Sequence, residues 1–260
     1  MSGYNIGDVT KYIRYQSASG VSYGTLEGDT VHQIQGDLFD GYTPTGATHP
    51  LSEVKLLYPC APSKILAVGL NYKSHLGTRP QPSHPEMFYK PVTALQNPLD
   101  PIVIPRDATD VHSEGEMVVV IGKRLRNASE TEAGDAIFGV TCGNDVSERA
   151  WQRSDRTLWR AKNSDTFKPM GPRIVSGIDP MNQVIEVRVN GRRVSSYNTS
   201  AMIFGVAHFI SRMSRYLTLH PNDVIWFGCD GPTEPALKPG DLVEVANDAI
   251  GVLANRVVSA

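Results

Sequence analysis

The chain has 260 residues, of which 40% are hydrophobic and 20% are charged, a composition that is typical of globular proteins and excludes a disordered or fibrous one. Its 25 Lys and Arg against 27 Asp and Glu give a formal charge of -2, so the chain lacks the basic field that nucleic-acid binding generally requires. No stretch approaches the roughly 20 apolar residues that span a bilayer, and residues 1–15 lack the apolar core of a signal peptide. We therefore expect a cytoplasmic protein that binds neither nucleic acid nor membranes.

The three cysteines, Cys60, Cys142 and Cys229, are too few and too widely spaced for a disulfide framework. None of them has the close cysteine neighbour that is typical of a zinc site. We expect reduced and mostly buried thiols.

Short alternating segments separated by glycines fill the first part of the chain and predict a small antiparallel meander. They cover residues 12–15, 21–26 and 30–34. Residues 41–63 are rich in Gly, Pro and Thr and show no long period, so we interpret them as a connection into a larger domain. We place the boundary at Ser63, which gives an N-terminal domain over 1–63 and a second domain over 64–260.

The second domain is predicted to be rich in strands. Wholly apolar runs over 65–69 and 117–121 are typical of buried strands. The proline-rich segment 71–91 lies between them and predicts either a lid or a surface loop. The pair Asn190-Gly191 interrupts the alternating run 184–194 and predicts a hairpin. Further strands are expected over 138–142, 224–227, 242–245 and 250–253.

Few helices are expected. Ser129 and Glu132 fit a capping box that opens a short helix reaching residue 137. Apolar residues recur at helical spacing over 203–217, which predicts a helix of more than three turns with Thr199 or Ser200 as its cap. Another helix is expected over 147–156.

A pair of glutamates precedes the apolar run 117–121. Glu114 and Glu116 are two residues apart, and on a strand such residues project from the same face. Two carboxylates at the mouth of a buried strand repel each other, so one must take up a proton or both must share a cation. Asp145 follows the next strand and can converge on the same point. Three carboxylates without His or Cys suit a hard ion such as Mg²⁺ or Mn²⁺. On spacing alone, edge-strand charges and a helix cap remain an open alternative.

Ordered motifs run through most of the second domain. They are Val68 to His75, Phe88 to Pro91, Glu114 to Glu116 with Gly122 and Lys123, Gly143 to Arg149, Gln152, Ala161 to Phe167, Gly171-Pro172 and Leu237 to Asp241. Through these motifs, residues 64–258 resemble the catalytic domain of the fumarylacetoacetate hydrolase family, which includes 2-hydroxyhepta-2,4-diene-1,7-dioate isomerases, acylpyruvases and oxaloacetate decarboxylases. The resemblance implies an α+β fold, with a strand-rich mixed β-roll after the small N-terminal β domain, and a homodimer.

The resemblance also implies roles for individual residues. The family's metal carboxylates fall on Glu114, Glu116 and Asp145, the three residues that the strand argument had brought together. Lys162 matches the active-site lysine, which offers positive charge to a developing oxyanion. Gln152 matches a substrate-contacting glutamine. Arg149 lies in the same motif and either binds substrate or pairs with a carboxylate near the metal.

His75 is the candidate general acid and base, because a histidine can exchange a proton near neutral pH. Hydrolytic members of the family usually place a Glu three residues after this histidine, forming a dyad that activates water. This chain has Thr78 there, and His84 or Glu86 could replace the missing acid. A second departure lies at 227–231, where Cys229 stands at the position of a substrate-binding threonine and Asp230 at that of a proline.

In proteins similar to this one, the substrate is a 2-oxo or 1,3-diketo acid whose carboxylate and carbonyl oxygens chelate the metal. A divalent Lewis acid stabilises the enolate that carbon-carbon hydrolysis, decarboxylation and isomerisation share. We therefore expect a Mg²⁺- or Mn²⁺-dependent enzyme that acts on a small 2-oxo diacid, an acylpyruvate or an unsaturated 2-hydroxy diacid in aromatic-compound catabolism. The missing dyad glutamate favours decarboxylation or isomerisation over hydrolysis.

Two other interpretations remain open. The first is a family member without turnover that binds metal and 2-oxo acid, because Thr78 and Cys229 depart from the family pattern; the presence of Lys162 and of the three carboxylates argues against it. The second is a lactone or sugar-acid hydrolase with Ser147 or Cys142 as nucleophile. Neither residue lies in a Gly-x-Ser-x-Gly turn, which argues against this second class.

Overall fold

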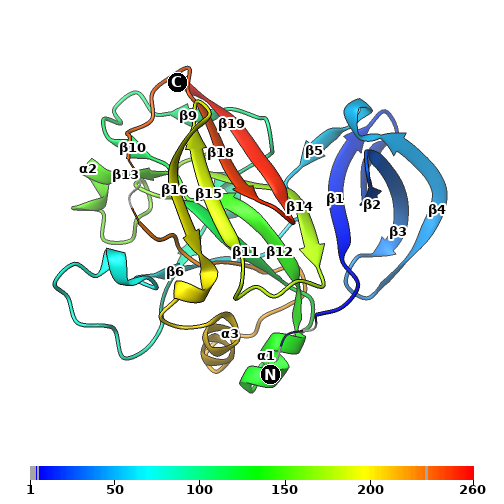
Figure 1. Cartoon of the computed structure of the whole chain (residues 1–260), viewed down its shortest axis with the longest axis horizontal. Helices are drawn as coiled ribbons and strands as arrows, with labels where there is room; N and C mark the ends of the chain where they lie inside the picture. Colours follow the sequence, from blue (N-terminus) through cyan, green and yellow to red (C-terminus); the bar gives the residue numbers. More distant parts are fainter. Residues whose placement is uncertain (1–3, 5, 232–233) are drawn as a thin grey trace.

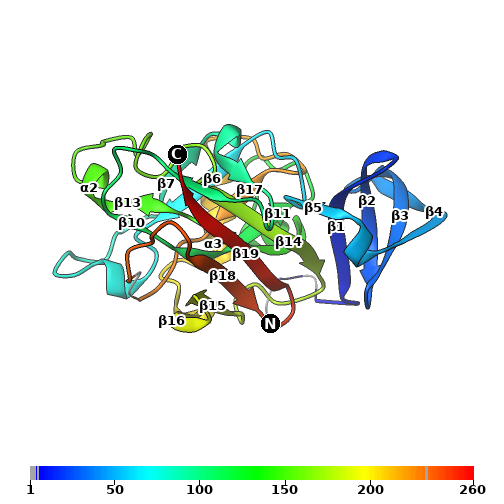
Figure 2. The ribbon, with the colours of Figure 1, turned by 90° about the horizontal axis from the view of Figure 1, so that it is seen from above.

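Residues 10–57 form an antiparallel meander at one end of the molecule (Figure 1, Figure 2). The computed structural model describes residues 4, 6–231 and 234–260. The strands of the meander are β1 (Thr10–Ser17), β2 (Gly20–Glu27), β3 (Thr30–Asp37), β4 (Gly41–Pro50) and β5 (Lys55–Leu57). Strands β1 to β4 pair in chain order, and β5 pairs with the second half of β1. The predicted meander is confirmed.

The prediction of a plain connection over 41–63 is wrong. β4 pairs with β3, and a 3-10 turn, η1 (Leu51–Glu53), leads into β5. Glycine and proline break the apolar alternation in this stretch, so the sequence hides the strand. Because β4 is the outer strand of its sheet, it tolerates proline on the side that has no partner.

Two large sheets and one two-stranded sheet make up the described part of the fold. The larger one continues from the meander, because β1 also pairs with β14, and its strand order is β4-β3-β2-β1-β14-β12-β11-β17-β6-β7. The smaller one has the order β16-β15-β18-β19-β9. The pairs β6 with β17, β8 with β14 and β9 with β19 are parallel, whereas the neighbours along the rest of both paths are antiparallel. This strand-rich mixed roll with few helices confirms the predicted α+β fold.

The strands of the larger sheet beyond the meander are β6 (Ile65–Gly69), β7 (Glu86–Lys90), β8 (Leu95–Gln96), β11 (Gly115–Ile121), β12 (Ile137–Asn144), β14 (Lys168–Ser176) and β17 (Val224–Trp226). The smaller sheet contains β9 (Ile102–Ile104), β15 (Val184–Val189), β16 (Arg192–Asn198), β18 (Leu242–Asn247) and β19 (Gly251–Ser259). β10 (Val111–His112) pairs with β13 (Ser147–Glu148). Every predicted strand overlaps one of these, and the predicted hairpin joins β15 to β16.

β11 lies in the interior of the larger sheet and all of its residues are buried. Alternate side chains enter two different cores. Met117 and Val119 pack with residues of the smaller sheet and of helix α3 (Val206–Ser214), whereas Val118 and Val120 pack with Trp226 and its neighbours. Strand β11 therefore has no solvent-facing side, which explains its uninterrupted apolar run.

The helices are short. α1 (Glu130–Asp135) has the predicted capping box, in which the Glu132 amide donates to Ser129 Oγ at 3.2 Å and the Ser129 amide donates to Glu132 Oε2 at 2.8 Å. α3 begins later than predicted, with Gly205 as its N-cap, and is shorter than three turns. The expected caps Thr199 and Ser200 instead lie in the turn η4 (Thr199–Ala201).

The helix predicted over 147–156 is largely wrong. Ser147 and Glu148 form β13, and only the single turn α2 (Arg149–Gln152) is helical. The backbone of Arg149 donates to Asp110 O and that of Glu148 to Ala161 O, at 2.8 and 2.7 Å. Tertiary hydrogen bonds thus replace the helical ones at the start of this segment.

The proline-rich segment 71–91 is loop only in its middle. The turn η2 (Lys73–His75) begins it, and β7 ends it by pairing with β6 along its whole length; the turn η3 (Val92–Ala94) follows. The intervening residues project at the end of the molecule opposite the meander (Figure 1, Figure 2). The prediction of a lid or surface loop therefore applies to residues 76–85 alone.

Within the described parts of the chain, we find no helix that is both long and apolar enough to cross a membrane. The three cysteines are free and buried, as predicted.

Gly143 of β12 faces the indole of Trp226. A Cβ atom at this position would lie 2.5 Å from Cζ3 of Trp226 and 2.7 Å from Cγ2 of Val118, and both of these side chains are fully buried. We therefore expect Gly143→Ala to lower the free energy of unfolding by about 1–3 kcal/mol, as overpacking of a core does. Chemical denaturation measures this change. Gly7→Ala is the control, because its added methyl group meets no atom within 4 Å. A Gly143→Ala protein as stable as its parent would contradict this packing.

Candidate active site

A cavity of about 350 Å³ opens beside β6, β7 and α2. Its lining includes all the candidate residues except Asp145, namely His75, Glu114, Glu116, Arg149, Gln152, Lys162 and Cys229. The chain segments around it lie at the end of the molecule opposite the meander (Figure 1, Figure 2). The fold therefore brings together residues that lie far apart in the sequence.

The three candidate metal carboxylates form one cluster. Glu114, Glu116 and Asp145 are all buried, and each offers an oxygen within 4.8 Å of the others. The antiparallel pairing of β11 with β12 explains this, because Gly115 pairs with Asn144 and the start of β11 lies beside the end of β12. The Asp145 amide donates to Glu114 O at 2.7 Å, which fixes the two backbones side by side.

Gly115 separates the two glutamates and faces the other way. A Cβ atom here would collide with Cγ2 of Val187 and lie 3.1 Å from Cγ1 of Val245, both in the smaller sheet. Glycine therefore lets β11 pack closely against β15 and β18. Glu114 and Glu116 project from the opposite face of the strand.

Four cationic side chains surround the three carboxylates. Lys162 Nζ lies 2.5 Å from Glu114 Oε2 and 3.3 Å from Asp145 Oδ2, and Arg149 Nη2 lies 2.5 Å from Glu114 Oε1. Lys90 and Lys168, with fully buried side chains, lie 2.7 and 2.5 Å from the two oxygens of Asp145. Charges buried this deeply are tolerated only when they are closely paired.

These charges give the three carboxyl groups different pKa values. Burial opposes ionisation of Asp145, but Lys162, Lys168 and Lys90 outweigh it and hold the pKa of Asp145 well below its usual range. Lys162 and Arg149 likewise outweigh burial at Glu114 and lower its pKa. Burial, followed by the charge on Asp145, raises the pKa of Glu116 to about 8. Glu116 is thus the member of the cluster with too little positive charge beside it.

Sequence reasoning missed the roles of Lys90 and Lys168. Lys90 Nζ lies 4.6 Å from the centre of the Phe88 ring, and Lys168 Nζ donates to the carbonyl oxygens of Val146 and Phe167 at 3.0 and 2.9 Å. Burial lowers the pKa of both lysines, to about 7 for Lys168. A sequence feature could have indicated them, because each lysine stands at one end of a largely apolar strand, directly before a proline.

The turn α2 carries Arg149 and Gln152 into the cavity wall. Glu148 caps it by accepting from the Trp151 amide at 2.5 Å, and the same buried carboxylate accepts from the Asp110 amide at 2.8 Å. Arg149 Nη1 donates to Gln152 Oε1 at 2.9 Å while its Nη2 pairs with Glu114. The ion pair considered for Arg149 is thus present, and its binding of substrate stays a prediction.

His75 lies at the end of η2 on the cavity wall. Its Nε2 is 3.2 Å from the carbonyl oxygen of Gly231. Glu86 lines the same cavity, whereas Thr78 is exposed and is not among the lining residues. His84 is not among the residues that line this cavity; it lines another pocket, with Phe209 and Met213 of α3.

Cys229 is buried in the cavity wall, and burial raises the pKa of its thiol well above the ordinary value, so the thiol stays neutral. The residue before it connects the loop to the carboxylates, because the Gly228 amide donates to Glu116 Oε2 at 2.8 Å. Tyr197 Oη lies 3.0 and 3.1 Å from the carbonyl oxygens of Gly115 and Gly228, which share its one hydroxyl proton. The loop after β17 is thereby fixed to β11.

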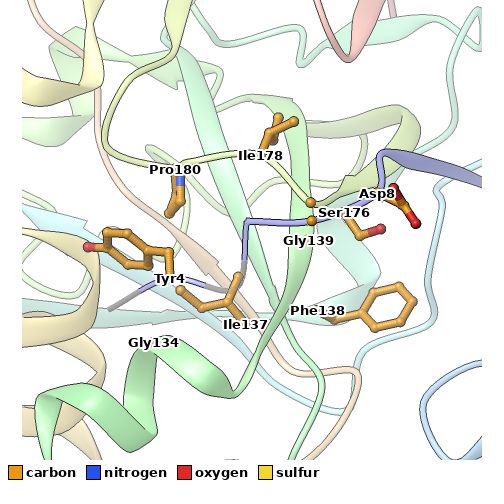
Figure 3. Close-up of a pocket in the computed structure, with 11 residues that line it drawn as sticks. Tyr4, Asp8, Gly134, Ile137, Phe138, Gly139, Ser176, Ile178 and Pro180 are labelled. Carbon is orange, nitrogen blue, oxygen red and sulfur yellow. The ribbon is translucent and has the colours of Figure 1, made fainter. Parts of the chain in front are cut away.

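Figure 3 shows another cavity, of about 200 Å³, which lies between Tyr4 and Asp8 of the N-terminal segment, α1, β12 and β14. Its lining consists largely of glycines and apolar side chains such as Ile137 and Ile178. Among the described residues that line it, Asp8 is the one charged side chain, and Asp8 is exposed. The carboxylate cavity, in contrast, brings together several buried charged side chains with shifted pKa values, so it is the candidate active site.

The carboxylate cluster fits a divalent cation. Its three donors are carboxylate oxygens, which hard ions such as Mg²⁺ and Mn²⁺ prefer. Burial and, after it, the charge on Asp145 raise the pKa of Glu116, and a bound cation would favour its ionised form. Glu114, Glu116 and Asp145 are the residues that would hold the ion. Glu114 and Glu116 line the cavity, which leaves room for water or substrate beside the ion.

Comparison with known proteins assigns the fold to a family. Residues 64–258 match the family model described as fumarylacetoacetate (FAA) hydrolase, C-terminal, and residues 10–59 match the one described as Rv2993c-like, N-terminal. The chain belongs to the fumarylacetoacetate hydrolase family. It is therefore an enzyme of that family, and the predicted resemblance is confirmed.

Three relatives of this fumarylacetoacetate hydrolase family enzyme show the range of activities around it. The structure of a 5-carboxymethyl-2-hydroxymuconate delta-isomerase from Mycobacterium smegmatis is 37% identical, has a TM-score of 0.90, and aligns over 96% of this chain and 100% of its own. A mitochondrial oxaloacetate tautomerase from Bos taurus is 37% identical over 227 residues, which cover 80% of this chain and 71% of the relative. A maleylpyruvate hydrolase from Sphingobium sp. SYK-6, in complex with manganese(II) and pyruvate, is 25% identical with a TM-score of 0.78, over 96% and 99% of the two chains.

We expect the family enzyme to bind Mn²⁺, and we expect Glu116→Ala to lose that binding or weaken it by more than about tenfold, because one of three anionic ligands is removed. Calorimetric titration measures the affinity. Glu130→Ala, which removes an exposed glutamate at the start of α1, is the matched control and should bind as the parent does. Unchanged affinity in alanine variants of Glu114, Glu116 and Asp145 would contradict the site.

Proposed function

We propose that this enzyme acts through an enolate on a small 2-oxo or 1,3-diketo acid, or on an unsaturated 2-hydroxy diacid. The observation that carries the proposal is a cluster of three buried carboxylates in contact with Lys162, of which Glu114, Glu116 and Lys162 line one cavity and Asp145 lies directly behind them. Relatives named as an isomerase, a tautomerase and a hydrolase of such acids support it. A divalent ion held by Glu114, Glu116 and Asp145 would supply Lewis acidity that stabilises negative charge on a substrate oxygen.

Lys162 supplies positive charge on the cavity wall. Burial opposes ionisation of this amine, but Asp145 and Glu114 outweigh it and raise the pKa, so the ammonium persists at neutral pH. A fixed charge in a largely buried site stabilises a developing enolate oxygen more than it would in water. Gln152 lies on the same wall with its Oε1 engaged by Arg149, which leaves its amide N–H groups to donate to substrate.

His75 is the proposed general acid and base. It lines the same cavity as Lys162, so a substrate held between them can exchange a proton with the imidazole. Among the described residues, no Asp or Glu forms an ion pair with the His75 ring, which instead hydrogen-bonds to the Gly231 carbonyl oxygen. An imidazolium formed while activating water would lack the stabilisation that a carboxylate gives. We therefore favour isomerisation or decarboxylation over hydrolysis.

The remaining features of the proposal rest on the family. We propose Mg²⁺ or Mn²⁺ as the ion, and the manganese complex of the maleylpyruvate hydrolase supports the second. We propose a homodimer and a role in aromatic-compound catabolism from the same resemblance, and we keep the cytoplasmic location expected from the sequence as a proposal. We also propose the domain boundary at Ser63, which the separate family matches over 10–59 and 64–258 support.

A second candidate is a protein that binds metal and 2-oxo acid without turnover. Cys229 favours it, because a neutral thiol is a weaker hydrogen-bond donor than the threonine hydroxyl at this position in the family. Assaying acylpyruvates, oxaloacetate and 2-hydroxydienedioates with Mg²⁺ separates the two candidates. Turnover of at least one of them supports the enzyme. Binding of all of them without turnover supports the second candidate.

We expect Lys162→Met to lower kcat on the best of these substrates by more than about tenfold, or roughly 1.4 kcal/mol of barrier, because the charge opposite the enolate oxygen is lost. Mn²⁺ binding should survive. Steady-state kinetics and calorimetry measure the two effects. Lys123→Met, which changes an exposed lysine outside the cavity, is the control. Full activity of Lys162→Met would mean that this lysine has no catalytic role.

We expect Thr78→Glu to raise acylpyruvate hydrolysis, because it restores an acid three residues after His75, while Glu86→Gln leaves hydrolysis unchanged. Rates of acylpyruvate cleavage in the parent and both variants measure this. The opposite pattern, efficient hydrolysis by the parent that collapses in Glu86→Gln, would show that Glu86 already completes the dyad from β7.

A further inference from the structure

The loop after β17 bonds at one end to the carboxylate cluster and at the other to the turn that carries His75. At the first end, the Gly228 amide donates to Glu116 Oε2 at 2.8 Å. At the second end, three residues later, the Gly231 carbonyl accepts from His75 Nε2 at 3.2 Å. Residues 228–231 therefore connect a proposed metal ligand to the proposed general acid and base.

Ser74 and Asp230 strengthen the second end. Ser74 Oγ donates to Asp230 Oδ1 in a short hydrogen bond, and the Gly231 amide donates to Ser74 Oγ at 3.1 Å and to Asp230 Oδ1 at 3.0 Å. Ser195 Oγ in β16 donates to the Asp230 carbonyl oxygen at 3.2 Å, which fixes the loop to the smaller sheet. The turn η2 is thus bonded to the loop through adjacent residues, Ser74 and His75.

The contact with Gly231 also selects one form of the imidazole. A backbone carbonyl is an acceptor only, so Nε2 must carry the proton when it bonds to Gly231 O. In the neutral ring, Nδ1 then holds the lone pair that can accept a proton. The Gly231 carbonyl thus orients the ring without a carboxylate.

We propose that Ser74 and Asp230 form a clasp that positions His75 at the cavity, with Asp230 and Ser74 acting as positioning residues rather than catalytic ones. This inference rests on the proposed function in taking His75 as the general acid and base. Asp230 is the residue that stands where the family commonly has proline, and a proline has no side-chain oxygen with which to bind Ser74. The clasp explains a role for Asp230 in place of proline, because it holds His75 in position where the dyad glutamate is missing.

Hydrogen exchange tests the clasp without any substrate. In Ser74→Ala and in Asp230→Ala, backbone amides over 73–79 should exchange at least about tenfold faster than in the parent. Asp230→Asn keeps an oxygen that accepts from Ser74 and Gly231, so it should restore slow exchange. Ser83→Ala is the matched control, because Ser83 lies in the same segment but contacts His84. Exchange over 73–79 that is equal to the parent's in both alanine variants overturns the clasp.

Kinetics on the best 2-oxo acid tests the positioning role. Ser74→Ala and Asp230→Ala should lower kcat by about tenfold while Asp230→Asn stays within about threefold of the parent, and Mn²⁺ affinity should not change in any of them. Faster exchange with an unchanged kcat overturns positioning, as does an Asp230→Asn variant as impaired as Asp230→Ala. If the parent turns over none of the acids, the proposed function fails, and the exchange rates still decide whether the clasp exists.

Discussion

The balance of charge around three buried carboxylates is the constraint on which the site depends. An unpaired buried ion costs several kcal/mol, so Glu114 and Asp145 are stable as anions only because lysines and Arg149 contact them. Glu116 receives less compensation, and burial and the neighbouring charge raise its pKa to about 8. The cluster therefore combines fixed anions with one carboxyl that a divalent ion would readily ionise. Lys162, one of these lysines, also keeps positive charge on the cavity wall.

The two sheets supply this geometry through backbone pairing more than through helices. The start of β11 lies beside the end of β12, and Gly115 lets the smaller sheet approach from the other side. The loop after β17 then bonds to Glu116 at Gly228 and to His75 at Gly231. The proposed metal ligands, Lys162 and His75 are thus carried on segments that share hydrogen bonds. A shift in any one of them would change the distances of the others.

Local sequence patterns predicted many of the strands and part of the candidate site. The buried strands, the capping box at Ser129 and the hairpin at Asn190 follow from short-range chemistry, and the same-face spacing of Glu114 and Glu116 follows from strand geometry. Strand β4 was not predicted, because its prolines and glycines interrupt the alternation that indicates a strand. The helix expected from Ser147 does not form at its start, because the backbone there makes tertiary hydrogen bonds instead. The strand ends before proline could have indicated Lys90 and Lys168 as unusual, but not their partner Asp145, because a lysine's partner depends on which strands become neighbours.

Enolate formation can be measured before any substrate is identified. Pyruvate in D₂O exchanges its methyl protons only through its enol or enolate, so proton NMR follows the step that hydrolysis, decarboxylation and isomerisation share. We predict that the protein with Mg²⁺ accelerates this exchange and that Glu116→Ala abolishes the acceleration. Exchange no faster than with Mg²⁺ alone would contradict the assignment of the carboxylate cavity as an enolate-forming active site.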